Sequence, residues 1–331
     1  MSSSSSSMGS KKVEAFRYPP FIQVHEDGRI ERVRQDVFVP PSVDPSTGVS
    51  SKDVVIPPKT SVSSKDVELP PESVLSARLY LPKGAKPHSK LPLLIYFHGG
   101  GFIIESAFSP TYHNYLNLLV EKTNVVAVSV NYKRAPEYPV PIAYEDSWTA
   151  VKWVFSNESG EEWLSNYADF NKVYMSGDSS GANLVHNMAI RAHSEPNDRI
   201  KFNGIILVHP YFFGVEPIES EGETDDLGKL WSAVCPATSG PDDPLLNPFK
   251  DPNFSKGPFS KEVCKRVLVC VAEKDILIHR GRSYYQELRK SGYDGVVEFM
   301  EYDEEHVFHL HTPELENACD FMNRVVAFLS A

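Results

Sequence analysis

From residue 74 to the end of the chain, short apolar runs alternate with longer segments whose apolar residues recur at helical spacing. The runs are rich in β-branched residues and short, which is typical of strands buried on both faces. Such a chain buries its strands in a doubly wound, mostly parallel α/β sheet with helices on both faces. The expected strands are 76–82, 91–97, 124–131, 172–176, 204–209, 266–272 and 296–302, and the expected helices are 112–122, 144–157, 181–193, 280–292 and 313–329.

Two segments fall outside this alternation. Residues 1–18 are polar and rich in serine, so we expect them to be disordered and the single domain to run from 19 to 331. Residues 211–262 separate two core strands and carry glycine, proline, acidic and aromatic residues. A structureless loop of that length is rare in a compact domain. We therefore expect a lid over a binding site, with helix around Leu227–Val234.

The region before residue 74 contains a hairpin signal and a duplication. Asp27-Gly28 separates two alternating segments, which predicts a β-hairpin. VSSKDVVIPP (49–58) recurs as VSSKDVELPP (62–71). Two copies are too few for a solenoid. We interpret them as a tandem duplication in a surface segment, where extra loop length adds little closure entropy.

Charge and cysteine usage exclude several classes of function. The formal net charge is −11, which disfavours nucleic acid and anionic membranes as partners. No run approaches the roughly 18 apolar residues of a membrane span, and no secretory signal is present. The cysteines have no CxxC spacing, so we expect reduced thiols, no zinc site and a cytoplasmic location. They are Cys235, Cys264, Cys270 and Cys319.

Gly177-Asp178-Ser179-Ser180-Gly181 matches the pattern G-x-S-x-G, in which a serine occupies a sharp turn between a strand and a helix. An expected strand precedes the pattern and an expected helix follows it. Ser179 would stand at the apex as a nucleophile, whereas Ser180 would begin the helix and offer its backbone N–H to an oxyanion. The alternative is an ordinary structural turn.

His98-Gly99-Gly100-Gly101 follows another expected strand. Consecutive glycines remove every Cβ where backbone N–H groups must reach a ligand. Esterases build oxyanion holes from this run together with the amide after the nucleophile. We therefore expect Gly100, Gly101 and Ser180 to form the oxyanion hole, although glycines can also serve a tight loop alone.

An activated serine needs a base, and the base needs a carboxylate. In α/β-hydrolases these follow the serine in the order acid, then histidine. Asp275 comes just after the expected strand 266–272, with Glu273 as the alternative. Asp242 and Asp243 lie in the expected lid and are more typical of solvated loop charges.

His306 directly follows the last expected strand and fits the position of the base best. The other histidines fit less well. His309 and His311 approach the last helix, and His279 is one helical turn from Asp275 on the same element. His186 and His209 precede the acid in the chain.

The ordered motifs resemble those of plant carboxylesterases in the hormone-sensitive-lipase-like group of α/β-hydrolases. The resemblance rests on HGGGF (98–102), NYKRAPEYPVPIAYED (131–146), GDSSGAN (177–183) and the segments around Asp275 and His306. It covers the chain from Pro20 to the C-terminus. It implies a cap built from about 19–45 and 211–262, and the duplicated VSSKDV segment departs from the family pattern.

The resemblance implies several functions. The family contains ester hydrolases, the gibberellin receptor, 2-hydroxyisoflavanone dehydratases and alkaloid cyclases. The receptor lacks the catalytic histidine, whereas His306 is present here. The dehydratases often carry threonine at the nucleophile, so Ser179 favours hydrolysis of a small, plant-specialised-metabolite ester without cofactor or metal. A dehydratase-type or cyclase-type lyase using the same histidine is the alternative.

Apolar residues near the site are candidate substrate contacts, because ligand cavities are mostly apolar and aromatic. Each is equally plausible as a packing residue of the core or lid. The sequence does not indicate an oligomeric state. The candidates are Phe102 after the glycines and Phe212, Phe213, Trp231 and Leu245 in or near the insertion.

Overall fold

The computed structural model divides the chain into two units, residues 1–35 and 36–331. In the first unit, β1 (Phe16–Tyr18), β2 (Ile22–Val24) and β3 (Ile30–Arg32) form an antiparallel sheet. The β2–β3 pair is the hairpin expected around Asp27. Strand structure thus begins at residue 16, inside the segment expected to be disordered. The residues described are 16–18, 21–27, 29–32, 36–57, 74–156, 160–195, 200–218, 221 and 225–331.

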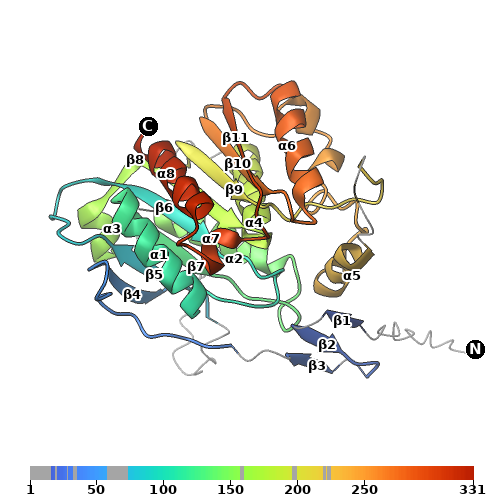
Figure 1. Cartoon of the computed structure of the whole chain (residues 1–331), viewed down its shortest axis with the longest axis horizontal. Helices are drawn as coiled ribbons and strands as arrows, with labels where there is room; N and C mark the ends of the chain where they lie inside the picture. The colour runs from blue at the N-terminus through green and yellow to red at the C-terminus, as the bar shows by residue number, and fades with distance from the viewer. Residues whose placement is uncertain are drawn as a thin grey trace, which may run out of the picture. The chain divides into compact units, whose positions relative to one another are not determined.

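The second unit contains an eight-stranded sheet in the order β11-β10-β9-β8-β6-β7-β5-β4 (Figure 1). The six strands from β11 to β7 are parallel, whereas β5 runs antiparallel to its neighbours. The mostly parallel sheet is confirmed, and every expected strand is present. The strands are β4 (Ser50–Val55), β5 (Ser76–Leu81), β6 (Leu91–Phe97), β7 (Val126–Asn131), β8 (Ala168–Asp178), β9 (Gly204–Val208), β10 (Arg266–Ala272) and β11 (Val296–Tyr302).

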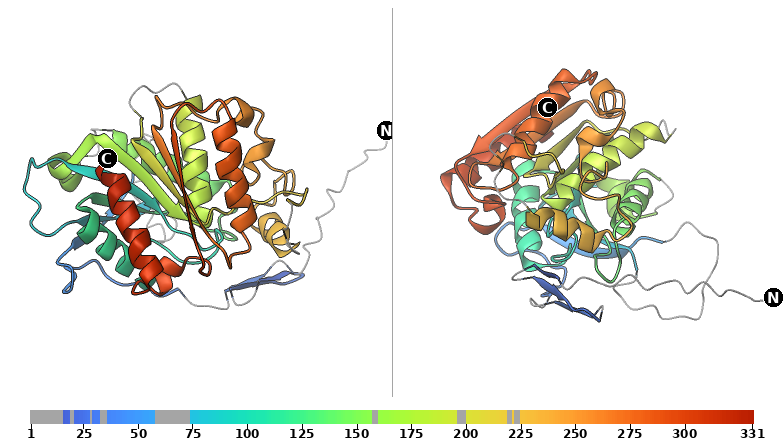
Figure 2. Two further views of the ribbon diagram at one scale, coloured as in Figure 1. Left: turned by 45° about the horizontal axis from the view of Figure 1, so that its top comes forward. Right: turned by 90° about the vertical axis from the view of Figure 1, so that its right-hand side faces the viewer.

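Helices cover both faces of this sheet (Figure 2). Apolar side chains of α1 and α8 pack in one buried cluster with alternate strand residues such as Leu94, Ile206 and Leu268. On the other side, α2 packs against α4. No helix in the described ranges is long and apolar enough to cross a membrane. The helices are α1 (Pro110–Thr123), α2 (Ile142–Phe155), α3 (Glu162–Tyr167), α4 (Ser180–Ser194), α5 (Asp225–Val234), α6 (Ile278–Lys290), α7 (Phe308–His311) and α8 (Glu316–Ser330).

The first copy of the duplicated segment forms β4, an edge strand that the sequence did not predict. Its side chains are mostly half-exposed, so no apolar alternation marks it. It is held instead by backbone pairing with β5 and by Asp53, which accepts two hydrogen bonds from the buried Arg78 guanidinium at 2.6 and 2.8 Å. The second copy, 62–71, lies outside the described residues.

The insertion 211–262 contains the expected helix as α5, followed by the short 3-10 helices η3 (Pro248–Lys250) and η4 (Phe254–Lys256). Polar contacts fasten it to the core. Asn183 on α4 donates to the Tyr211 and Leu245 carbonyls at 3.0 and 2.8 Å. On α6, Arg280 donates two hydrogen bonds to Glu221, at 2.8 and 2.7 Å, and both side chains are buried.

Breaking the Arg280–Glu221 pair should destabilise the fold strongly. We expect Arg280→Ala to lower the free energy of unfolding by about 3–5 kcal/mol, because Glu221 is left as a buried, unpaired carboxylate. Arg282, two residues along α6, makes a similar pair with Glu301, but these side chains are 38% and 25% exposed. Arg282→Ala should therefore lower the free energy of unfolding by about 1 kcal/mol or less. Urea denaturation of both variants measures the two losses, and losses of equal size would contradict the prediction.

Candidate active site

Ser179 occupies the sharp turn between β8 and α4. Its backbone angles are φ 53° and ψ −121°, a conformation that non-glycine residues rarely adopt. Three backbone hydrogen bonds hold it there. Ser179 N–H donates to Val208 O at 2.9 Å, and Ser179 O accepts from the N–H groups of Tyr211 and Asn183 at 3.0 and 3.2 Å. The side chain is partly exposed. The turn therefore presents the hydroxyl beyond the end of the sheet.

The flanking glycines allow this turn to lie directly on the end of β6. A Cβ on Gly181 would come within 2.1 Å of the Phe97 carbonyl oxygen, and one on Gly177 within 2.7 Å of the same atom. Both contacts are with backbone, which cannot rotate away as a flexible side chain could. The two glycines are therefore required by the close approach of two chain segments.

The His98–Gly101 loop follows β6 and lies against this turn. Gly100 and Gly101 have φ values of 101° and 60°, which favour glycine. Phe102 N–H donates to Ser180 Oγ at 3.3 Å, which joins the loop to the first turn of α4. Within the described part of the chain, no protein group accepts a hydrogen bond from the amides of Gly100, Gly101 or Ser180. These three donors remain available to a ligand.

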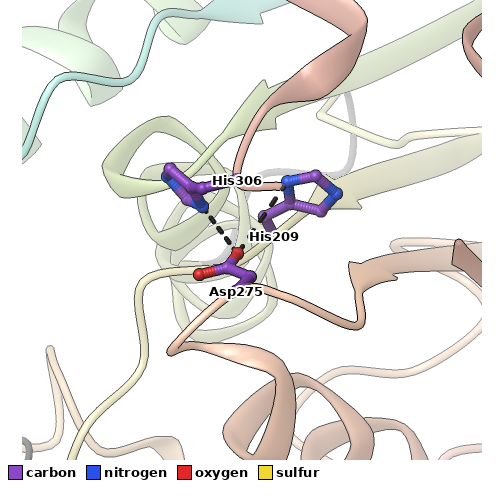
Figure 3. Close-up of side chains that lie close together, drawn as sticks. All are labelled: His209, Asp275 and His306. Atoms are coloured by element: carbon purple, nitrogen blue, oxygen red, sulfur yellow. Dashed lines mark hydrogen bonds and ion pairs between the residues drawn. The ribbon is translucent and has the colours of Figure 1, made fainter. Parts of the chain in front are cut away.

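Asp275 and His306 come together after β10 and β11. His306 Nδ1–H donates to Asp275 Oδ2 at 2.6 Å, and Leu277 N–H donates to the other carboxylate oxygen at 3.0 Å (Figure 3). The carboxylate is buried, whereas the imidazole side chain is 37% exposed. Because Nδ1 carries the proton, Nε2 of the neutral ring keeps its lone pair.

The electrostatics of this pair favour a charged histidine. Burial alone would raise the pKa of Asp275, but the hydrogen bond and charge of His306 hold that pKa below its ordinary value. Burial likewise opposes protonation of His306, yet the hydrogen bond and charge of Asp275, with a smaller contribution from Asp178, raise its pKa. Asp275 therefore stabilises an imidazolium on His306.

His209 supports this pair. From the sequence alone this residue fits the site less well, because it precedes the acid in the chain. It follows β9 and is buried, and its Nδ1 accepts the Val307 N–H at 2.8 Å. Val307 has a left-handed φ of 50°, so the bond fixes the backbone next to His306. The position of His209 at the carboxyl end of a core strand is the signal that could have found it.

His209, Asp275 and His306 are also grouped closely enough to suggest a metal site, since their ligand atoms all lie within 4.8 Å of one another. The hydrogen bonds do not fit one. Nδ1 of His209 is already an acceptor, and the Nδ1 proton of His306 points at the carboxylate. The cluster suits proton transfer.

The other candidate acids and bases have separate positions. Glu273 is exposed, while Asp242 and Asp243 accept hydrogen bonds within the insertion. His186 is buried with its Nδ1 2.9 Å from the Tyr284 hydroxyl oxygen, and His309 is buried against Tyr115 and Phe321. His279 lies on α6, and His311 is exposed at the end of α7.

The candidate substrate contacts are mostly packing residues. Phe102, Phe212 and Trp231 have no accessible surface, so they do not face an open cavity in this structure. Phe102 packs against Trp231, Tyr144 and Tyr211, with ring centroids about 6 Å apart. Phe213 is 7% exposed and Leu245 is half-buried. The aromatic residues thus tie the glycine loop to α5.

Comparisons with known proteins agree with this fold. Residues 94–310, which include Ser179, Asp275 and His306, match the alpha/beta hydrolase fold. Probable carboxylesterase 2 of Arabidopsis thaliana is 42% identical over 325 residues, 97% of this chain and 98% of the relative. The 2-hydroxyisoflavanone dehydratase of Glycyrrhiza echinata is 40% identical over 346 residues, 99% and 100% of the two chains. A hyperthermophilic esterase from the archaeon Pyrobaculum calidifontis has a TM-score of 0.66 at 26% identity, over 84% of each chain.

The steric requirement for glycine at position 181 can be tested with Gly160, a glycine without close neighbours, as the control. We expect Gly181→Ala to slow fluorophosphonate labelling of Ser179 by about 10²-fold, because a displacement of about 1 Å can have that effect on a reacting group. Gly160 has a left-handed φ of 57° and no atom within 4 Å of an added Cβ. Gly160→Ala should lower stability through its backbone yet leave the labelling rate unchanged. Equal labelling of the two variants would contradict the steric account.

Proposed function

The chain belongs to the plant carboxylesterases of the α/β-hydrolase family and is a carboxylic-ester hydrolase, and we propose that it acts through an acyl-enzyme on Ser179. The observation that carries this proposal is the 2.6 Å hydrogen bond from His306 to the buried Asp275. That bond orients an imidazole with a free Nε2 at the same sheet edge as the strained serine. The remaining steps follow from the geometry of this edge.

His306 is the general base of the proposed reaction. Its Nε2 takes the proton of the Ser179 hydroxyl while Oγ attacks the ester carbonyl carbon. Asp275 holds the ring in the required tautomer and stabilises the imidazolium that forms, in accord with the raised pKa of His306. The partly exposed imidazole and hydroxyl leave room for a substrate.

The amides of Gly100, Gly101 and Ser180 receive the oxyanion in this mechanism. They are free of protein acceptors, and the Phe102–Ser180 hydrogen bond holds their two segments together. Loss of one such donor typically lowers kcat by about 10²–10³-fold. When the tetrahedral intermediate collapses, the carbon–oxygen bond to the alcohol breaks and His306 gives its proton to that oxygen. Water then attacks the acyl-enzyme with His306 again as base, releasing the acid and restoring Ser179.

The proposed substrates are small esters of plant specialised metabolism. Half-buried Leu245 and the nearly buried Phe213 are the proposed contacts, whereas Phe102, Phe212 and Trp231 are fully buried and would act only through packing. The proposed chemistry uses only side chains and backbone amides of this chain. A cytoplasmic location stays a prediction.

A lyase reaction at the same site is the second candidate. The 40% identity to a 2-hydroxyisoflavanone dehydratase over nearly the whole chain favours it. In that case His306 would remove a carbon-bound proton, the three amides would stabilise an enolate, and no acyl-enzyme would form. Incubation with p-nitrophenyl esters beside hydroxyisoflavanones and alkaloid acetates, with products identified by mass spectrometry, distinguishes the two reactions.

The two adjacent serines provide a matched test of the hydrolase mechanism. Ser179→Ala should abolish burst-phase release of p-nitrophenol from p-nitrophenyl acetate, because no acyl-enzyme can form. Ser180→Ala keeps the backbone amide but loses the hydroxyl that accepts from Phe102 N–H and hydrogen-bonds with Tyr132, so it should retain a burst at a reduced rate. Stopped-flow absorbance measures both. A burst retained in Ser179→Ala would overturn the assignment of the nucleophile.

A further inference from the structure

We propose that Asp178 is a positioning residue of this site: its buried carboxylate holds the glycine loop through Tyr112 and acts electrostatically on His306. The inference rests on the proposed function, since it assigns how the same site is held and charged. Asp178 ends β8 and directly precedes Ser179 in the strained turn, and its carboxylate is buried. The acid that contacts His306 directly is Asp275, which leaves Asp178 without a role in the triad.

A short chain of hydrogen bonds leads from Asp178 to the glycine loop. The Tyr96 and Tyr112 hydroxyls donate to its two carboxylate oxygens, each at 2.7 Å. Gly99 N–H donates to the Tyr112 oxygen, also at 2.7 Å. Because the ionised carboxylate can only accept, the direction of each bond is fixed. Tyr112 therefore transmits the position of the carboxylate to the first glycine of the loop.

The loop also packs directly against the Asp178 carboxylate at Gly99. A Cβ on Gly99 would come within 2.3 Å of Asp178 Oδ2 and 2.9 Å of the Asp178 carbonyl oxygen. The Gly99 amide is occupied by Tyr112, whereas the next two amides along the loop have no protein acceptor in the described part of the chain. Fixing Gly99 thus sets where the amides of Gly100 and Gly101 point.

Burying the Asp178 carboxylate lowers the stability of the folded protein. This cost suggests that the residue has a functional role. Asp178 is 1% exposed, and in the described residues no lysine, arginine or histidine forms an ion pair with it. Burial raises its pKa to about 6, despite the hydrogen bonds from Tyr112 and Tyr96. An uncharged residue would avoid this penalty. Such perturbed groups gather at functional sites.

The cation that Asp178 can stabilise is the imidazolium of His306. Its charge contributes to the raised pKa of His306, after the larger effect of Asp275. The buried tyrosines and the other buried histidines around these residues are neutral at physiological pH. Burial raises the pKa values of Tyr96, Tyr112, Tyr115 and Tyr132 and lowers those of His209 and His309. The charge balance at His306 is therefore set by two aspartates.

Three variants separate the two parts of this role. Tyr112→Phe removes the link to Gly99 and keeps the charge of Asp178, whereas Asp178→Asn removes the charge as well. Tyr115→Phe is the matched control, because Tyr115 is a buried residue of the same helix whose hydroxyl makes no hydrogen bond to the described residues. The measurements are kcat, KM and the pH profile of kcat/KM with p-nitrophenyl acetate, with circular dichroism to confirm folding.

We expect Tyr112→Phe to lower kcat by about 10-fold to 10²-fold through misplaced oxyanion donors, with little change in KM. The acid limb of kcat/KM should stay in place. Asp178→Asn should lower kcat similarly and also move the acid limb to lower pH. The sign follows because His306 must be neutral to act as base, and loss of a nearby negative charge lowers its pKa. Tyr115→Phe should retain the wild-type kcat and pH profile.

Wild-type kcat in folded Tyr112→Phe, or an unmoved acid limb in folded Asp178→Asn, would overturn the inference. An equal loss of kcat in Tyr115→Phe would also overturn it, since that points to general packing. If Asp178→Asn does not fold, Asp178→Ser, which also removes the charge, takes its place for the pH profile, and Tyr112→Phe still tests the link to the glycine loop. Failure of the proposed function has a different signature: the wild-type protein itself would show no burst and no labelling of Ser179.

Discussion

The contact between the turn at Ser179 and the end of β6 is the constraint on which the site depends. Gly177 and Gly181 meet the Phe97 carbonyl at distances that exclude any side chain. This contact brings the first turn of α4 beside the glycine loop, and the Phe102–Ser180 hydrogen bond closes the junction. A strained backbone at Ser179 is tolerated because strands β6 and β9 hold it on either side.

Electrostatic preorganisation completes the arrangement. Two buried carboxylates, Asp275 after β10 and Asp178 at the end of β8, both raise the pKa of His306, with the larger effect from Asp275. The amides of Gly100, Gly101 and Ser180 have no protein acceptor among the described residues, while the bond between Val307 and His209 fixes the backbone beside His306. In the proposed reaction, groups held in this way would need little reorganisation as charge moves from serine to histidine.

Much of this could be predicted from the sequence, because apolar runs and ordered motifs carry local information. The core strands, the α5 region and the pairing of Asp275 with His306 follow from such patterns. β4 did not, because a half-exposed edge strand lacks an apolar period. The link from Asp178 through Tyr112 joins residues far apart in the chain, so no spacing reveals it. Burial of Phe102 and Trp231 depends on how the insertion packs.

In the proposed reaction Ser179, and not its neighbour, carries the acyl group. The most direct measurement is to quench the protein with acid during turnover of p-nitrophenyl acetate and to locate the adduct by peptide mass spectrometry. The account predicts one added acetyl group on Ser179, which disappears when the substrate is exhausted. Turnover without an adduct, or an acetyl group on Ser180, would contradict it.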